Sequence, residues 1–160
     1  MIVYHGGLEI IKKPDVAHSY RRLDFGKGFY VTAVRVQAEK WARRKANISD
    51  RDFAIVNQYA LCENFGDFRV KTFQEDLGEW IDFVCSCRDG KTAYAQYDII
   101  IGRVADDKVF RVVDMYHQGI WDRERALKEI KVYKAYDQIC FVSQSALDTL
   151  LQFEAAYEVC

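Results

Sequence analysis

The chain has 160 residues, of which 50% are hydrophobic and 29% are charged, and its formal net charge is −1. This composition predicts a single globular domain over residues 1–160 and excludes a disordered chain. The near-zero charge excludes an overall basic field for nucleic acid, and no apolar run approaches the roughly 20 residues of a membrane-spanning helix. We therefore expect a cytoplasmic protein with no membrane partner and no secretory leader.

The expected elements follow from hydrophobic spacing and from the residues that interrupt it. β-Branched and aromatic runs indicate strands, apolar residues at helical spacing indicate helices, and glycines and turn residues separate them. In chain order the sequence predicts strand 2–5, loop 8–22, glycine loop 24–28, strand 29–32, helix 34–47, strands 53–62 and 68–73, helix 75–87, turn 88–91, strand 97–104, turn 105–108, helix 121–130, strand 138–142, helix 143–150 and strand 153–159. This irregular mixture favours an α+β fold built on mostly antiparallel sheet.

Three local signals sharpen these expectations. The continuous apolar run from Tyr97 to Val104 is typical of a buried central strand. Asp122 and Glu124 lie near the start of the helix at 121–130, the end at which acids are favourable. Ser143 is a suitable N-cap for the short helix that follows it.

The five cysteines predict free thiols in a reducing compartment. Their number is odd, and the Cys85-Ser86-Cys87 spacing is too tight for the usual zinc sites. His18 and His117 complete no metal-ligand spacing either. We therefore expect no metal site.

The glycine loop is the first feature that indicates a ligand. Gly26 and Gly28 bracket Lys27, and such glycines let a main chain pass close to a bound molecule. No Gly-Lys-Ser/Thr follows, so the segment is not a P-loop, and the strand-loop-helix context of a dinucleotide fingerprint is missing. Alone, the glycine pattern is common in loops.

The pattern becomes more specific when four segments are taken in order. They are Tyr4–Gly7, Phe25–Thr32, Gln37–Ala42 and Asp137–Gln144. This order resembles the ADP-ribosyltransferases of the diphtheria-toxin and poly(ADP-ribose) polymerase type, which carry a strand-borne His-Gly, an F-G-K-G-x-Y segment, a ring residue about eleven positions further on and a late Glu. It is most similar to a family of small uncharacterised bacterial proteins with a D-F-G-x-G-F-Y segment. The resemblance implies an ADP-ribosyltransferase-like fold, with split antiparallel β-sheets and flanking helices.

The resemblance also implies a site for NAD+ as substrate. His5 would hydrogen-bond the nicotinamide-side ribose, and Gly6 would bind the carboxamide through its backbone. Tyr30 and Trp41 would flank the nicotinamide ring, while Lys27 would either contact a phosphate or remain a solvated loop lysine. The residues implied in binding are His5, Gly6, Lys27, Gly28, Tyr30 and Trp41, and those implied in catalysis are His5, Tyr30 and Gln138.

Each of these residues also has a purely structural interpretation, and one departs from the family pattern. Gln138 stands where the relatives place Glu, whose carboxylate stabilises an oxocarbenium ion. Glutamine keeps a hydrogen bond but loses the charge, which makes chain elongation unfavourable. Asp137 would face the opposite way in a strand. Tyr136 stands where arginine-specific relatives carry an acid, so the acceptor stays open.

The expected function is mono-ADP-ribosyl transfer to a macromolecular acceptor, protein or nucleic acid, with release of nicotinamide. Small bacterial relatives often act as toxins or defence effectors, so an antitoxin or other partner protein is a further expected partner by analogy. Two alternatives on the same site are a non-catalytic module that binds NAD+ or ADP-ribose and an NAD+ glycohydrolase. RNA 2′-phosphate transfer and a partner-binding protein without activity are more distant alternatives.

Overall fold

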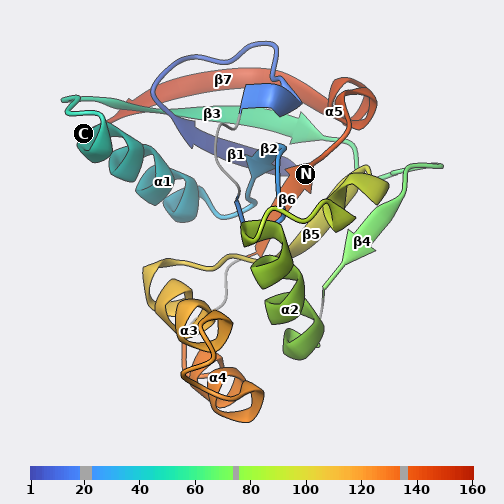
Figure 1. Cartoon of the computed structure of the whole chain (residues 1–160). Helices are drawn as coiled ribbons and strands as arrows, with labels where there is room; N and C mark the ends of the chain where they lie inside the picture. Colours follow the sequence, from blue (N-terminus) through green and yellow to red (C-terminus); the bar gives the residue numbers. More distant parts are fainter. Residues whose placement is uncertain (19–22, 74–75, 134–136) are drawn as a thin grey trace.

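Strands and helices of the chain form a mixed α+β structure with two sheets (Figure 1). The computed structural model describes residues 1–18, 23–73, 76–133 and 137–160. The strands are β1 (Ile2–Gly7), β2 (Phe29–Val31), β3 (Ala54–Leu61), β4 (Val70–Thr72), β5 (Ile99–Arg103), β6 (Asp137–Phe141) and β7 (Leu151–Val159). The α-helices are α1 (Arg35–Ile48), α2 (Leu77–Arg88), α3 (Asp107–His117), α4 (Arg123–Ile130) and α5 (Gln144–Leu150), and the 3-10 helices are η1 (Val16–His18) and η2 (Ala93–Gln96).

The first sheet has three strands in the order β1-β3-β7, and both pairings are antiparallel. Helix α1 packs on this sheet through small side chains. Ala38, Ala42 and Ala46 are buried against Val56 of β3, which lets the helix approach the sheet closely. The close approach positions α1 beside the glycine end of β1.

The second sheet has four strands in the order β2-β6-β5-β4, with β4 parallel to β5 and the other pairs antiparallel. Its alternating side chains enter two different cores, because successive residues of a strand face opposite sides. Tyr30 and Cys140 enter a core shared with α2, α3 and α4, whereas Phe29 and Phe141 enter one shared with α5 and the first sheet. The two sheets are therefore held together by the second of these cores.

Most predicted elements are confirmed, including the buried strand at β5 and the mostly antiparallel pairing. Ser143 caps α5 as predicted, since its Oγ accepts a hydrogen bond from the Ala146 N–H at 3.3 Å. Asp122 caps α4 by accepting from the Arg125 N–H at 2.8 Å. Glu75, Tyr136 and residues 19–22 of the predicted loop lie outside the described residues.

Two expectations are wrong. The predicted turn at 105–108 is instead the start of α3, because the Asp106 carboxylate accepts a hydrogen bond from the Val109 N–H at 3.1 Å and begins a helix. The first strand does not stop before its glycines, since Gly6 and Gly7 continue the pairing with β3.

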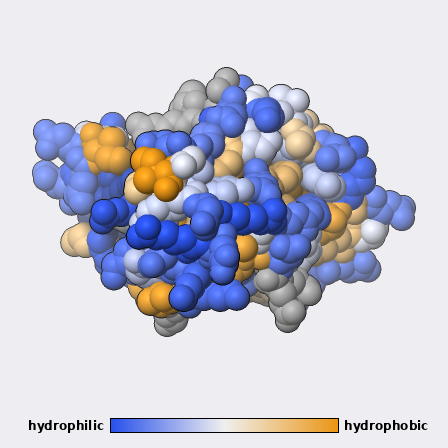
Figure 2. Space-filling view, turned by 60° about the horizontal axis from the view of Figure 1, so that its bottom comes forward, coloured by the Kyte–Doolittle hydropathy of each residue, from blue (hydrophilic) through white to orange (hydrophobic). Residues whose placement is uncertain are grey.

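The molecular face in Figure 2 is mostly hydrophilic, and its hydrophobic residues lie in small separate groups. Scattered apolar residues of this kind are ordinary on protein surfaces. Within the described ranges, no helix has both the length and the apolar character needed to cross a bilayer.

Candidate functional site at the junction of the two sheets

The two sheets meet at one antiparallel bridge between Tyr4 of β1 and Thr32, which follows β2. The Tyr4 N–H donates to the Thr32 carbonyl at 2.8 Å, and the Thr32 N–H donates to the Tyr4 carbonyl at 2.9 Å. The Thr32 hydroxyl also donates to the Asp137 carbonyl at 2.9 Å, which brings the start of β6 to the same place. We call this region the sheet junction.

His5 lies next to the bridge, and its ring is buried with 5% of its surface exposed. Its Nδ1 is 2.7 Å from the Tyr30 carbonyl oxygen, and a carbonyl can only accept, so Nδ1 carries the proton. The ring also stacks on Phe29 with the centroids 4.3 Å apart. In the neutral imidazole, Nε2 therefore carries the lone pair and acts as an acceptor.

Gly6 is the point of closest contact between β1 and α1. A Cβ at this residue would lie 2.1 Å from the Ala38 carbonyl oxygen and 2.7 Å from the Ala42 nitrogen, so only glycine fits. The Gly6 carbonyl accepts a hydrogen bond from Lys45 Nζ at 2.7 Å. Trp41 lies on the same helix, between those two alanines in the sequence, and is half-buried.

Tyr30 supports the glycine loop from inside the core. Its hydroxyl donates to the Gly26 carbonyl at 2.6 Å and accepts from the Phe25 N–H at 3.0 Å. Burial, with the nearby Cys140 thiol and Asp24 carboxylate adding to it, raises the pKa of Tyr30 well above its usual value, so the hydroxyl stays protonated. The ring packs in the core here, and its stacking on a ligand ring stays a prediction.

Gln138 is buried on β6, with 3% of its surface exposed, and the structure orients its amide. Nε2 donates to Asp24 Oδ2 at 3.0 Å and to the Arg103 carbonyl at 3.3 Å. Both partners are acceptors, which uses both N–H groups and assigns the amide nitrogen and oxygen. The carbonyl oxygen Oε1 is therefore the group that this side chain presents to a hydroxyl donor. Asp137 is exposed, as the alternation of a strand predicts.

Asp24 is the site residue that sequence reasoning missed. Its carboxylate accepts from Gln138, from the Ala105 N–H at 3.0 Å and from Arg88 Nη2 at 2.9 Å. The side chains of Asp24 and Arg88 are only 14% and 16% exposed, so this ion pair is largely shielded from water. The one available signal was an acid directly before Phe25-Gly26, and nothing in the sequence connects it to a residue 114 positions later.

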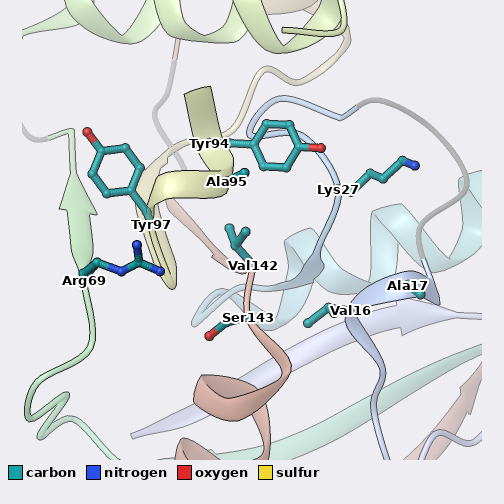
Figure 3. Close-up of a pocket in the computed structure, with 9 residues that line it drawn as sticks. All are labelled: Val16, Ala17, Lys27, Arg69, Tyr94, Ala95, Tyr97, Val142 and Ser143. Carbon is teal, nitrogen blue, oxygen red and sulfur yellow. The ribbon is translucent and has the colours of Figure 1, made fainter. Parts of the chain in front are cut away.

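The other predicted residues of the glycine loop are separated by the structure. Gly26 has φ = 79°, a left-handed conformation that glycine adopts without strain, and a Cβ there would meet the Tyr94 ring at 2.3 Å. Gly28 lies against β6, where a Cβ would come within 2.5 Å of Cys140 Sγ. Lys27 is exposed and lies at the edge of a separate pocket (Figure 3). The structure thus brings the backbones of His5, Gly6, Tyr30 and Gln138 to the junction and places Lys27 elsewhere. The His5 ring lies on the Phe29 side of β2, whereas the side chains of Tyr30 and Gln138 lie on the opposite side.

The cysteines divide into two exposed and three buried thiols, all of them free. Burial raises the pKa of the Cys85 thiol to about 11 and that of Cys87 to about 12, and raises that of Cys140 further. We expect iodoacetamide at pH 8 to label Cys62 and Cys160 in the folded protein, and intact mass spectrometry to show two adducts. Unfolding in guanidinium should make the other three thiols reactive as well. A third rapid adduct in the folded protein would show that one of these thiols is not buried.

No group of three His, Cys, Asp or Glu side chains in the described parts of the chain could hold a metal ion. The donors gathered at the junction are instead an imidazole, an amide and one carboxylate that is already paired with an arginine. Such a set is suited to hydrogen bonding of a polar organic ligand rather than to metal coordination.

The fold and site define a mixed α+β protein with buried polar side chains near the place where two small sheets meet. The chain belongs to the family described as "Protein of unknown function (DUF3990)", whose model matches residues 1–153. No curated protein and no solved structure matches the chain. The family assignment agrees with the expectation of a small uncharacterised family.

Proposed function

We propose that the chain is an NAD+-binding mono-ADP-ribosyltransferase whose reaction takes place at the sheet junction. The observation that supports the proposal is the junction of β1, β2 and β6, the strands that carry His5, Tyr30 and Gln138. His5 is hydrogen-bonded to the Tyr30 carbonyl, and Tyr30 lies opposite Cys140, two residues from Gln138 on the same strand. A split pair of sheets with these residue types at the split is the arrangement that the sequence resemblance implies.

The proposed reaction breaks the bond between the ribose C1′ and the nicotinamide nitrogen. The bonding electrons leave with nicotinamide, which becomes neutral, and C1′ takes up positive charge. A nucleophilic oxygen or nitrogen of the acceptor then bonds to C1′ and loses its proton to solvent. His5 is suited to hold the ribose through Nε2, and Trp41 is suited to cover the nicotinamide ring.

Gln138 and Asp24 would act together in this reaction. The Gln138 Oε1 would accept a hydrogen bond from a ribose hydroxyl. The two N–H groups of the Gln138 amide would remain hydrogen-bonded to Asp24 and to the Arg103 carbonyl. A carboxylate bound to the amide N–H increases the electron density on the amide oxygen, because hydrogen bonds in a chain polarise one another. Asp24 would therefore increase the partial negative charge on the Gln138 Oε1, which compensates in part for the carboxylate charge that glutamine lacks.

The alternative function is binding of NAD+ or ADP-ribose without transfer, and one observation favours it. The Asp24 charge is offset by Arg88 at 2.9 Å, which reduces the field that reaches a developing cation. NAD+ hydrolysis, with water in place of the acceptor, is the intermediate case. All three need the same residues to hold NAD+.

The test measures nicotinamide release from labelled NAD+, with binding measured in parallel by calorimetry. We expect His5→Asn to lower nicotinamide release about 100-fold, the scale of losing one positioned hydrogen-bonding group. Asparagine can still donate to the Tyr30 carbonyl but loses the stacking on Phe29, so the thermal unfolding of the variant is measured to verify that it folds. The matched control is His117→Asn, at an exposed histidine paired with Asp89, which should leave release unchanged.

The outcomes separate the candidate functions. Release that depends on an added acceptor supports transfer, and release without one supports hydrolysis. Binding of NAD+ with release at background supports the non-catalytic module. If His5→Asn binds and releases as the unaltered protein does, the sheet junction is not the site.

A further inference from the structure

A pocket of about 370 Å³ lies beside the glycine loop, at the opposite end of β6 from Gln138 (Figure 3). Its size is within the range of small-molecule sites. In Figure 3 the rings of Tyr94 and Tyr97 extend in different directions, Val142 and Ser143 lie below them, and Val16 and Ala17 of η1 lie on another side. The residues that line it are Val16, Ala17, Lys27, Arg69, Tyr94, Ala95, Tyr97, Val142 and Ser143.

The glycine loop holds Lys27 in a fixed place on this pocket. The Gly26 backbone packs under the Tyr94 ring, and the Tyr30 hydroxyl bonds to both Phe25 and Gly26. Asp24 ties the start of the loop to the core. The loop therefore places the Asp24 side chain against Gln138 and places Lys27 on the lining of the pocket.

The side chains of the pocket select a flat and anionic ligand. Tyr94 and Tyr97 offer ring faces, and Val142 offers an apolar floor. Lys27 is exposed and forms no ion pair with a described residue, whereas Arg69 is bound by both oxygens of Asp98, at 3.1 and 3.3 Å. Among the described residues that line the pocket, Lys27 thus carries an uncompensated positive charge, which repels a guanidinium or ammonium group and attracts a phosphate.

We propose that this pocket binds a nucleotide unit, with its base against the Tyr97 ring and its phosphate near Lys27. Stacking on aromatic rings next to a cation is the way in which single-stranded nucleic acids and free nucleotides are held without strict sequence preference. Lys27 is thereby assigned to this ligand instead of NAD+. The pocket would be the acceptor subsite of the transferase, and this second part rests on the proposed function.

The distance between the pocket and the junction suits an anchoring role. Gln138 and Val142 are four residues apart along an extended strand, which corresponds to about 13 Å. A base seated in the pocket is therefore too distant to be the reacting group itself. The reacting atom would belong to the sugar, the phosphate or a neighbouring nucleotide that extends from the pocket toward Gln138.

The test measures binding directly and needs no NAD+. A fluorescein-labelled ten-nucleotide oligoadenylate is titrated with protein at low salt and followed by anisotropy, and AMP is titrated by calorimetry. We expect Lys27→Glu to weaken binding at least tenfold, and Tyr97→Leu to weaken it about fivefold while Tyr97→Phe has little effect. The matched control is Lys108→Glu, an exposed lysine on α3. Thermal unfolding of each variant verifies that it folds.

Binding of AMP with the same dependence on Lys27 identifies a free nucleotide as sufficient, and binding of the oligonucleotide alone identifies a strand. Both support the pocket assignment. The inference is overturned if neither probe binds, or if Lys27→Glu binds them as well as the unaltered protein. It is also overturned if Lys27→Glu lowers NAD+ affinity by the same factor, because the pocket then belongs to NAD+. If nucleotides bind but nicotinamide is not released, the pocket assignment stands and the proposed transferase activity is rejected.

Discussion

Replacing Gly6 with alanine should lower the free energy of unfolding by about 3 kcal/mol, the upper part of the range for overpacking a well-packed site. The new Cβ would lie 2.1 Å from the Ala38 carbonyl oxygen and 2.7 Å from the Ala42 nitrogen. Both are backbone atoms within a helix, so no side-chain rotation can relieve the contact. The helix α1 must move away from β1, which also displaces Trp41. Chemical denaturation measures the loss.

The neighbouring glycine provides a matched control. A Cβ at Gly7 would meet only the His5 ring, at 3.6 Å, which is an ordinary van der Waals contact. Gly7→Ala should therefore stay within about 0.5 kcal/mol of the unaltered protein. If Gly6→Ala and Gly7→Ala lower the stability equally, the close approach of α1 to β1 is not the reason that a glycine is needed at position 6.

Gln138→Glu should destabilise the fold by about 2 kcal/mol instead of simply restoring the family's carboxylate. The new acid would be placed beside Asp24, whose Oδ2 is 3.0 Å from the Gln138 amide nitrogen. Two carboxylates at this separation cannot both ionise without a strong cost, so the pKa of one is expected to rise. A raised pKa makes the stability deficit largest at neutral pH and smaller as acid protonates the pair.

The double variant Asp24→Asn with Gln138→Glu places the amide at position 24 and the carboxylate at position 138. The hydrogen bond between the two side chains is thereby restored, with the asparagine N–H as donor and the glutamate oxygen as acceptor. We expect it to recover at least half of the lost stability, which a double-mutant cycle measures by denaturation. Its nicotinamide release should exceed that of the unaltered protein, because the negative charge now stands where Oε1 meets the ribose. If the double variant is no more stable than Gln138→Glu alone, the two side chains do not act as a pair.

The elements near the site could be predicted where local chemistry decides them. The apolar run of β5 and the serine before α5 are recognisable because burial and capping act within a few residues. Helix α3 was missed because its start contains the acids Asp106 and Asp107, which are equally typical of a turn. The apolar residues of its buried side include Val109, Val112 and Val113, whose β-branching does not favour a helix.

The polar cluster at the junction could be predicted only in part. His5 and Tyr30 could be singled out in the sequence because each lies within a glycine-containing segment that resembles a family motif. The interaction of Asp24 with Gln138 joins residues 114 positions apart, and only the folded sheet places the glycine loop beside the start of β6. The support of the loop by the Tyr30 hydroxyl also depends on which face of β2 enters the core.

The pairing of β3 with β1 on one side and β7 on the other has a consequence for synthesis on the ribosome. β1 precedes β3 by fewer than 50 residues, so this edge can be paired soon after β3 emerges. The other edge of β3 must wait for Leu151–Val159, about 90 residues later. Throughout that interval a strand with unsatisfied hydrogen-bonding groups is open to wrong partners. The nascent chain is therefore most vulnerable to aggregation between the emergence of β3 and that of β7.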